Sequence, residues 1–334
     1  MQDFIIRLIF CILFVAKSQQ LPSSLSVGTN SSGLNRESST WLNSPNNETT
    51  EDFLCEMSEF EEKRFSGHFA PIDEYTWMAL LIYEKTAYDF TSVCEGALIS
   101  KSFVVTAAHC LTGSMLQEMG HLMYVRLGEY HVSNDPDCIV EGQFQECTDE
   151  IIDVRPKSII VHPDYKVSNR SLHHDIGILK SGSSCSLKSL HPVKFSCFIR
   201  HISLPTEDSG IMGTSFFESG WGLTDIFYDK TTCIPSPIKL QKKLSYTDHD
   251  TCLDAYRSQR IQLTSDQICA VDSSSKGSCS GNVGTPLVQW NKHKSAWMLT
   301  GLRSAQYFEN GGKPGIYTNV YKYVQWIKTN AQLQ

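Results

Sequence analysis

From residue 75 onward, the chain alternates short apolar runs with polar turns that contain Gly or Pro. The apolar runs cover residues 77–83, 93–108, 122–127, 159–162 and 176–180. Short β-rich runs of this kind are typical of strands, and no helical spacing separates them. Many short strands without intervening helices predict an all-β domain, either an antiparallel barrel or a sandwich.

The end of the chain follows a different pattern. Val320, Tyr323, Val324 and Ile327 recur at the three- and four-residue spacing of one helix face. This spacing predicts that a single amphipathic helix closes the domain.

Two segments without a strand pattern precede the β-rich part. Residues 4–16 are apolar but too few to span a bilayer, and a small-residue site follows near Ser18. Residues 1–18 are therefore predicted to be a secretory signal peptide. Residues 19–54 are rich in Ser, Asn and Thr and cannot bury a core, which predicts a disordered stalk. No later segment is apolar enough to cross a membrane, so we expect a secreted, extracellular protein without a membrane span.

The composition fits a globular protein in an oxidising compartment. Of the 334 residues, 41% are hydrophobic and 19% are charged, and the net charge of −7 argues against binding to nucleic acid. Twelve cysteines are present, and Cys11 leaves with the predicted signal peptide. The odd number that remains predicts disulfides together with at least one thiol that is free or bonded to another molecule. Asn30, Asn47 and Asn169 each begin an Asn-x-Ser/Thr triplet, the form of a glycosylation acceptor.

Five motifs follow one another along the chain. They are Thr-Ala-Ala-His-Cys at 106–110, Asp-Ile-Gly-Ile-Leu at 175–179, Ser-Gly-Trp-Gly at 219–222, Cys-Ser-Gly-Asn-Val-Gly-Thr-Pro-Leu at 279–287 and Pro-Gly-Ile-Tyr-Thr-Asn-Val at 314–320. With these motifs in this order, residues 55–334 resemble the trypsin-like (chymotrypsin-fold) serine proteases, and within them the arthropod clip-type proteases. The resemblance implies two six-stranded antiparallel β-barrels with a C-terminal helix over residues 65–334. It also implies an activation or linker segment at residues 55–64.

The catalytic positions of that family can be read on this chain. In the family a serine attacks the carbonyl, a histidine takes its proton and an aspartate orients the histidine. The resemblance assigns the histidine to His109 and the aspartate to Asp175. The family loop Gly-Asp-Ser-Gly-Gly-Pro reads Gly281-Asn282-Val283-Gly284-Thr285-Pro286 here, so Val283 stands at the position of the nucleophile.

Valine has no hydroxyl, and loss of the nucleophile costs about 10⁶ in turnover in another serine protease. Ser280 and Thr285 are displaced along the loop, and an error of about 1 Å can already cost ~10²-fold. We therefore predict that the chain does not hydrolyse peptides. His109 and Asp175 are then expected to be retained as structural residues, a satisfied histidine and a buried, hydrogen-bonded carboxylate.

The activation step of the family is also altered. In the family, the acid before the serine pairs with the new amino terminus that activation cleavage creates, and Asn282 cannot form an ion pair. The resemblance places this cleavage between Arg64 and Phe65, where Phe-Ser-Gly-His replaces Ile-Val-Gly-Gly. The alternative interpretation of Lys63 and Arg64 is an exposed basic pair.

The substrate pocket departs from the family pattern at two places. Gly277 occupies the position of the aspartate that recognises Arg or Lys in trypsin-like members. Ser304-Ala305-Gln306 stands where the family has Ser-Trp-Gly, the edge along which the substrate backbone lies. The specificity pocket is therefore predicted to be degenerate.

The resemblance also implies disulfides. It pairs Cys94 with Cys110, Cys138 with Cys147, and Cys252 with Cys269. The linker cysteine of the family corresponds to Cys55, whose usual partner position holds Ser203, and the nearby Cys197 can take that place. Cys185–Cys197 is the alternative pairing, and it leaves Cys55 free to bond elsewhere. The cysteines without an assigned partner are Cys185, Cys233 and Cys279.

Two sets of residues raise the question of metals. Some relatives bind calcium in the loop from Glu129 to Glu141, which also carries Asp135, and a solvated acidic loop is the alternative. His173 and His174 are adjacent, point in different directions and have no evident third ligand. We predict no metal site at these histidines and expect no cofactor.

With the nucleophile replaced, the resemblance implies a regulator or cofactor of an extracellular proteolytic cascade such as innate immunity or melanisation. The expected partners are proteases, zymogens such as a prophenoloxidase, or inhibitors, bound through the surface that active relatives use for substrate. One alternative is a serine-type endopeptidase with an unrecognised nucleophile, and another is a pattern-recognition protein of microbial surfaces. Residues 19–54 contain no cysteine, so no clip domain is predicted there.

Overall fold

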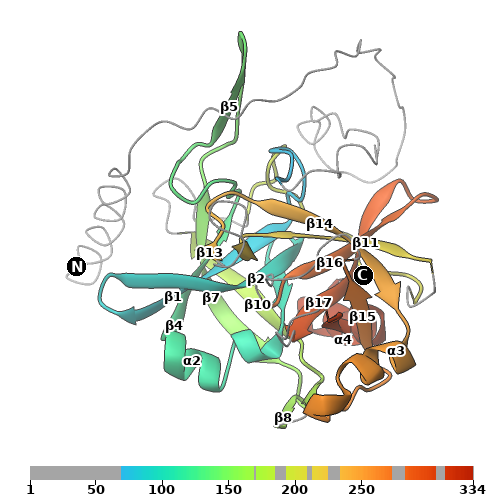
Figure 1. Cartoon of the computed structure of the whole chain (residues 1–334). Coiled ribbons are helices and arrows are strands. Elements are labelled where there is room, and N and C mark those ends of the chain that lie inside the picture. The colour runs from blue at the N-terminus through green and yellow to red at the C-terminus, as the bar shows by residue number, and fades with distance from the viewer. Residues whose placement is uncertain are drawn as a thin grey trace. The chain divides into compact units, whose positions relative to one another are not determined.

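Two closed barrels of six antiparallel strands form the body of the protein in the computed structural model (Figure 1). The structure describes residues 69–168, 171–184, 193–208, 213–224, 234–272, 283–305 and 313–333. The predicted signal peptide, stalk and activation segment lie outside these residues. The barrels confirm the fold that the resemblance implies.

The first barrel is built from the apolar runs identified in the sequence. Its strands are β1 (Met78–Thr86), β2 (Asp89–Ser100), β3 (Phe103–Thr106), β4 (His121–Leu127), β7 (Ile152–Val161) and β10 (Gly177–Ser184). They are hydrogen-bonded in the closed order β1-β2-β3-β10-β7-β4. Leu80, Leu98, Val105, Leu127 and Ile178 are buried in its core.

The second barrel is also a closed barrel of six antiparallel strands. Its strands are β11 (Ser215–Gly220), β14 (Leu240–Thr247), β15 (Gln267–Val271), β16 (Pro286–Asn291), β17 (Ala296–Ala305) and β18 (Gly315–Asn319), in the closed order β11-β14-β15-β18-β17-β16. Phe216, Leu244, Ile268 and Leu287 form part of its core. A further cluster of buried apolar side chains contains residues of both barrels, including Trp77 and Trp297, so the barrels pack against each other.

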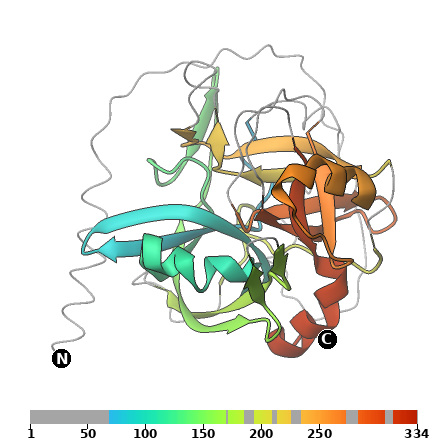
Figure 2. The same ribbon diagram turned by 60° about the horizontal axis from the view of Figure 1, so that its bottom comes forward.

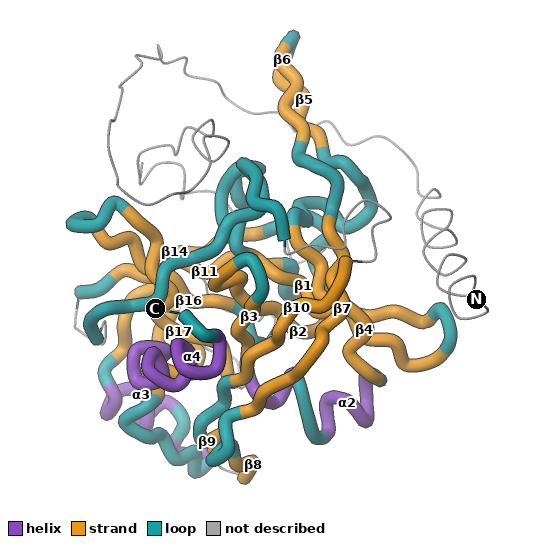
Figure 3. Tube along the Cα trace, turned by 180° about the vertical axis from the view of Figure 1, so that it is seen from behind, coloured by secondary structure: helices purple, strands orange, loops and turns teal. Residues whose placement is uncertain are grey.

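Small two-stranded sheets extend from the barrels. They are β5 (Cys138–Glu141) with β6 (Phe144–Cys147), β8 (Lys166–Ser168) with β9 (Ser171–His173), and β12 (Leu223–Thr224) with β13 (Ile234–Pro235). The β5–β6 hairpin projects from the first barrel, as Figures 1 and 3 show from opposite sides.

Short helices complete the described structure. They are α2 (Ser114–Met119), α3 (His249–Ala255), α4 (Val324–Ala331) and the 3₁₀ turns η3 (Ala108–Cys110), η4 (Arg257–Gln259) and η5 (Val320–Tyr323). The predicted C-terminal helix is therefore a 3₁₀ turn that continues into α4, whose Ile327 is fully buried. Figure 2 brings α2 and α4 toward the viewer. No helix in the described ranges is long and apolar enough to cross a membrane.

Candidate functional site

A histidine and an aspartate meet between neighbouring strands of the first barrel. His109 lies in η3, directly after β3, and Asp175 lies just before β10. Strands β3 and β10 pair with Gly177 opposite Thr106, and this register brings the two segments together. His109 Nδ1 lies 2.7 Å from Asp175 Oδ2, and the backbone N–H of His109 donates to Asp175 Oδ1 at 2.9 Å.

The second barrel also holds Asp175. Ser304 at the end of β17 donates its hydroxyl to Asp175 Oδ2 at 2.5 Å, and Thr318 of β18 donates to the Asp175 backbone oxygen at 2.9 Å. The Asp175 side chain is completely buried, whereas that of His109 is 15% exposed. A buried carboxylate needs such donors, since its charge has lost contact with water.

Val283 lies against strand β2 close to the histidine turn. It forms an isolated bridge with Cys94, and its backbone oxygen accepts a hydrogen bond from Glu95 N at 3.0 Å. Cys94 is joined by a disulfide to Cys110, the residue that follows His109. The valine side chain is partly buried and packs against the shared core. The site thus holds a histidine that an aspartate orients, with an apolar side chain on the neighbouring loop.

The family model described as Trypsin matches residues 64–327. The chain belongs to the trypsin family. Relatives of this trypsin-family chain include "CLIP domain-containing serine protease B8" of Anopheles gambiae, which is 38% identical over 82% of the chain and 67% of that protein. "Phenoloxidase-activating enzyme" of Bombyx mori is 34% identical over 81% of the chain and 61% of that protein. The chain therefore spans roughly two thirds of the length of these relatives.

Comparison with a solved structure also supports the trypsin-family fold. The Drosophila Grass clip serine protease of the Toll pathway superimposes with a TM-score of 0.65 at 27% identity. The match covers 85% of this chain and 76% of that one. The resemblance to clip-type proteases that the motifs indicated is confirmed.

Several predicted site residues of this trypsin-family chain lie outside the described ranges. They are Arg64 and Phe65 of the cleavage site, Gly277 and Gln306 of the pocket, Gly281 and Asn282 of the loop, the acceptors Asn30, Asn47 and Asn169, and Cys55, Cys185, Cys233 and Cys279. Ser304 lies within the described ranges, and its hydroxyl donates to Asp175. The resemblance placed Ser304 at the substrate edge and did not predict this contact. The order of the motifs gave no signal for this contact because the two residues are 129 positions apart.

The disulfides in the described ranges are those that the resemblance implied. They are Cys94–Cys110, Cys138–Cys147 and Cys252–Cys269. The first anchors the turn that carries His109, and the second joins the two strands of the β5–β6 hairpin. Cys197 is also disulfide-bonded, and its partner lies outside the described residues.

In the loop from Glu129 to Glu141, protein groups bind the carboxylate of Glu129. Glu129 is buried, accepts from Tyr130 N at 3.0 Å and lies 3.4 Å from an Arg126 guanidinium nitrogen. Burial raises the pKa of Glu129 to about 7, although the Arg126 charge opposes this shift. Lys239 is also buried, and burial lowers the pKa of its ammonium to about 8, while Glu129 favours the charged form. Two protein cations therefore interact with Glu129.

Asp135 of the same loop is also bound by a protein group. Asp135 Oδ1 accepts from Ile151 N at 3.0 Å, and burial raises the Asp135 pKa. Among the described residues, neither Glu129 nor Asp135 belongs to a group of three metal-ligating side chains with all ligand atoms within 4.8 Å of one another. The group that meets this criterion contains His109 and the two sulfurs of a disulfide, which are not thiolates. Calcium binding in this loop and a solvated acidic loop therefore stay alternative interpretations.

Proposed function

We propose that this trypsin-family protein is a non-catalytic regulator or cofactor of an extracellular proteolytic cascade. The observation that carries the proposal is Val283, a side chain without a hydroxyl on the loop next to the paired His109 and Asp175. In the mechanism of serine proteases the histidine base takes the proton of the serine hydroxyl, and valine has no such proton. The clip-type and phenoloxidase-activating relatives support a place in an immune cascade.

The hydrogen bonds of Asp175 give a reason to retain the pair without catalysis. The carboxylate binds His109 and Ser304, and so it joins the two barrels at a buried point. Leaving such buried donors without an acceptor costs about 1–3 kcal/mol each. The pair therefore stabilises the fold whether or not the protein cleaves peptides.

The described residues also argue against one substitute nucleophile. The Thr285 hydroxyl donates to the buried carboxylate of Glu95 at 2.8 Å. Thr285 itself is only 1% exposed, so its hydroxyl is engaged and shielded from a substrate. This contact supports a binding protein over an endopeptidase that uses Thr285.

A fluorophosphonate probe, which reacts with activated serines, tests the absence of catalysis. The secreted protein is treated before and after cleavage at Arg64, beside a variant that carries Val283→Ser and Asn282→Asp. We expect no labelling of either native form. A labelled native protein would contradict the proposal, and mapping the label would identify the nucleophile. As a control, adding His109→Ala to the double variant should abolish any labelling that the double variant shows.

The regulatory role is tested on a defined reaction. Processing of a prophenoloxidase zymogen by a phenoloxidase-activating enzyme is followed by gel densitometry with and without this protein. We expect the initial rate to change as the protein is titrated into the micromolar range. An unchanged rate at saturating concentration contradicts a role on this pair, and binding to bacteria or β-glucan would then favour the pattern-recognition alternative.

A further inference from the structure

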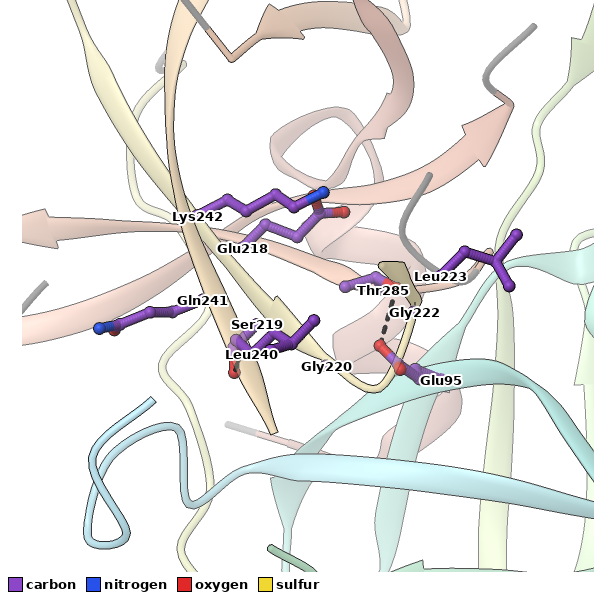
Figure 4. A pocket seen from close by; sticks show the side chains of 10 residues that line it. All are labelled: Glu95, Glu218, Ser219, Gly220, Gly222, Leu223, Leu240, Gln241, Lys242 and Thr285. Atoms are coloured by element: carbon purple, nitrogen blue, oxygen red, sulfur yellow. Dashed lines mark hydrogen bonds between the residues drawn. The ribbon is translucent and has the colours of Figure 1, made fainter. Parts of the chain in front are cut away.

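A second buried carboxylate lies behind the Val283 loop and takes no part in the His109–Asp175 pair. Glu95 belongs to β2 and is completely buried. Its Oε1 accepts from the backbone N–H of Trp221 at 2.7 Å, and its Oε2 accepts from the Thr285 hydroxyl at 2.8 Å. Figure 4 shows the Glu95 side chain reaching from the first barrel toward Thr285 and the strand end at Gly220 and Gly222.

The backbone of Glu95 binds the same loop. Its N–H donates to the Val283 oxygen at 3.0 Å. Its carbonyl oxygen accepts from the hydroxyl of Thr106 in the neighbouring strand β3 at 2.6 Å. On the other side of the loop, Gly284 N donates to Arg303 O of β17 at 2.7 Å. Residues 283–285 are therefore held between β2 and β17 by main-chain and side-chain bonds together.

Two glycines lie very close to Glu95. A Cβ atom added to Gly220 would lie 2.1 Å from Glu95 Oε2, and one added to Gly284 would lie 2.3 Å from the Glu95 backbone oxygen. Gly284 also has a φ of +76°, which side chains rarely adopt. The two glycines thus allow the chain to approach Glu95 at the distance that its hydrogen bonds need.

The anchoring uses a residue that departs from the family loop. Thr285 stands where the family pattern has glycine, and its hydroxyl is the side-chain donor that the loop gives to Glu95. The partners just described are Glu95, Trp221 and Arg303, and all of them belong to the part of the chain that follows the Arg64 cleavage site. None of these bonds requires a newly formed amino terminus.

We propose that Glu95 is a positioning residue that fixes residues 283–285 in the same conformation before and after cleavage at Arg64. This inference rests on the proposed function. If the protein binds a partner through the face around Val283, that face is already in its binding conformation in the uncut protein. Cleavage at Arg64 would then regulate a part of the protein other than residues 283–285.

Hydrogen exchange followed by mass spectrometry tests the proposal directly. The amides of Trp221 and Gly284 are compared in the full-length protein and in the protein cut after Arg64, with the new terminus confirmed by sequencing. We expect exchange rates that agree within about threefold, because the proposal requires that cleavage leave these hydrogen bonds in place. Exchange at Gly284 that is more than about threefold faster in the uncut protein would overturn the proposal.

A matched pair of variants tests the role of the hydroxyl. Thr285→Val removes the donor at nearly constant volume, and Thr285→Ser retains it. Loss of the donor leaves a buried acceptor unsatisfied, so the valine variant should exchange about tenfold faster at Trp221 and Gly284, with the serine variant close to wild type. Equal rates in the two variants would refute the anchoring role. Peptides from β10 serve as the internal control, since a general loss of stability would also accelerate their exchange.

The two proposals fail in distinguishable ways. A native protein labelled by fluorophosphonate contradicts the absence of catalysis and leaves the exchange rates as they are. If Thr285→Val does not fold, the comparison of cut and uncut wild-type protein still decides whether the loop depends on cleavage.

Discussion

Replacing Asp175 with alanine tests whether the retained histidine–aspartate pair is a structural element. The substitution leaves three donors without their acceptor: His109 Nδ1, the His109 backbone N–H and the Ser304 hydroxyl. The carboxylate is completely buried, so water cannot replace it without rearrangement. At about 1–3 kcal/mol for each unsatisfied donor, and with some relaxation, we expect a loss of about 3–6 kcal/mol in the free energy of unfolding.

The assay is urea unfolding followed by circular dichroism, with thermal unfolding as a second measurement. A loss of this size corresponds to a decrease in Tm of roughly 6–12 °C for a domain of this length. Asp175→Asn keeps one carbonyl acceptor and should lose about half as much, and Ser304→Ala should lose about 1 kcal/mol because it removes a single bond. If Asp175→Ala stays within about 1 kcal/mol of wild type, the pair is not retained for stability and the reasoning fails.

Two further predictions concern buried charges elsewhere in the barrels. Arg303 Nη2 lies 2.5 Å from Glu218 Oε2 inside the second barrel. Arg303→Met should therefore cost about 3–5 kcal/mol in the free energy of unfolding, because it leaves that carboxylate unpaired, and adding Glu218→Gln should recover part of the loss in the same assay. The Glu129 pKa is raised from 4.5 to about 7, so its contribution to stability is present below pH 4.5 and is lost as the pH rises through 7. Glu129→Gln should therefore show a shallower decline in unfolding free energy between these pH values, and an identical pH profile would contradict this assignment.

The sequence predicted the first barrel more completely than the second. Strands β1, β2, β3, β4 and β10 contain the short apolar runs that mark their positions in the sequence. The strands of the second barrel carry buried polar or charged residues such as Glu218, Gln241 and Arg303, which interrupt the hydrophobic pattern. These side chains are buried because they pair with one another or with backbone groups across the barrel, as Arg303 does with Glu218. Local periodicity carries no information on such partners, so the second barrel came from the resemblance.

The candidate site likewise combines residues that the sequence predicts with contacts that it does not. His109 and Asp175 lie in motifs that identify them from the sequence alone. Their supporting contacts join distant positions, since Ser304 binds a residue 129 positions away and Thr285 binds one that is 190 positions away. Such contacts depend on how the two barrels pack, which the pattern of apolar residues within one strand does not specify.

The projecting β5–β6 hairpin offers a practical point of attachment. The Cys138–Cys147 disulfide closes the hairpin at its base, where these two residues are partners in the β5–β6 ladder. A Cβ atom at Gly142, in the turn that joins the strands, would meet no other atom within 4 Å. A short labelling peptide inserted in this turn should therefore leave both barrels folded. It would give a fluorescent or surface-immobilised form of the protein whose face around Val283 carries no modification.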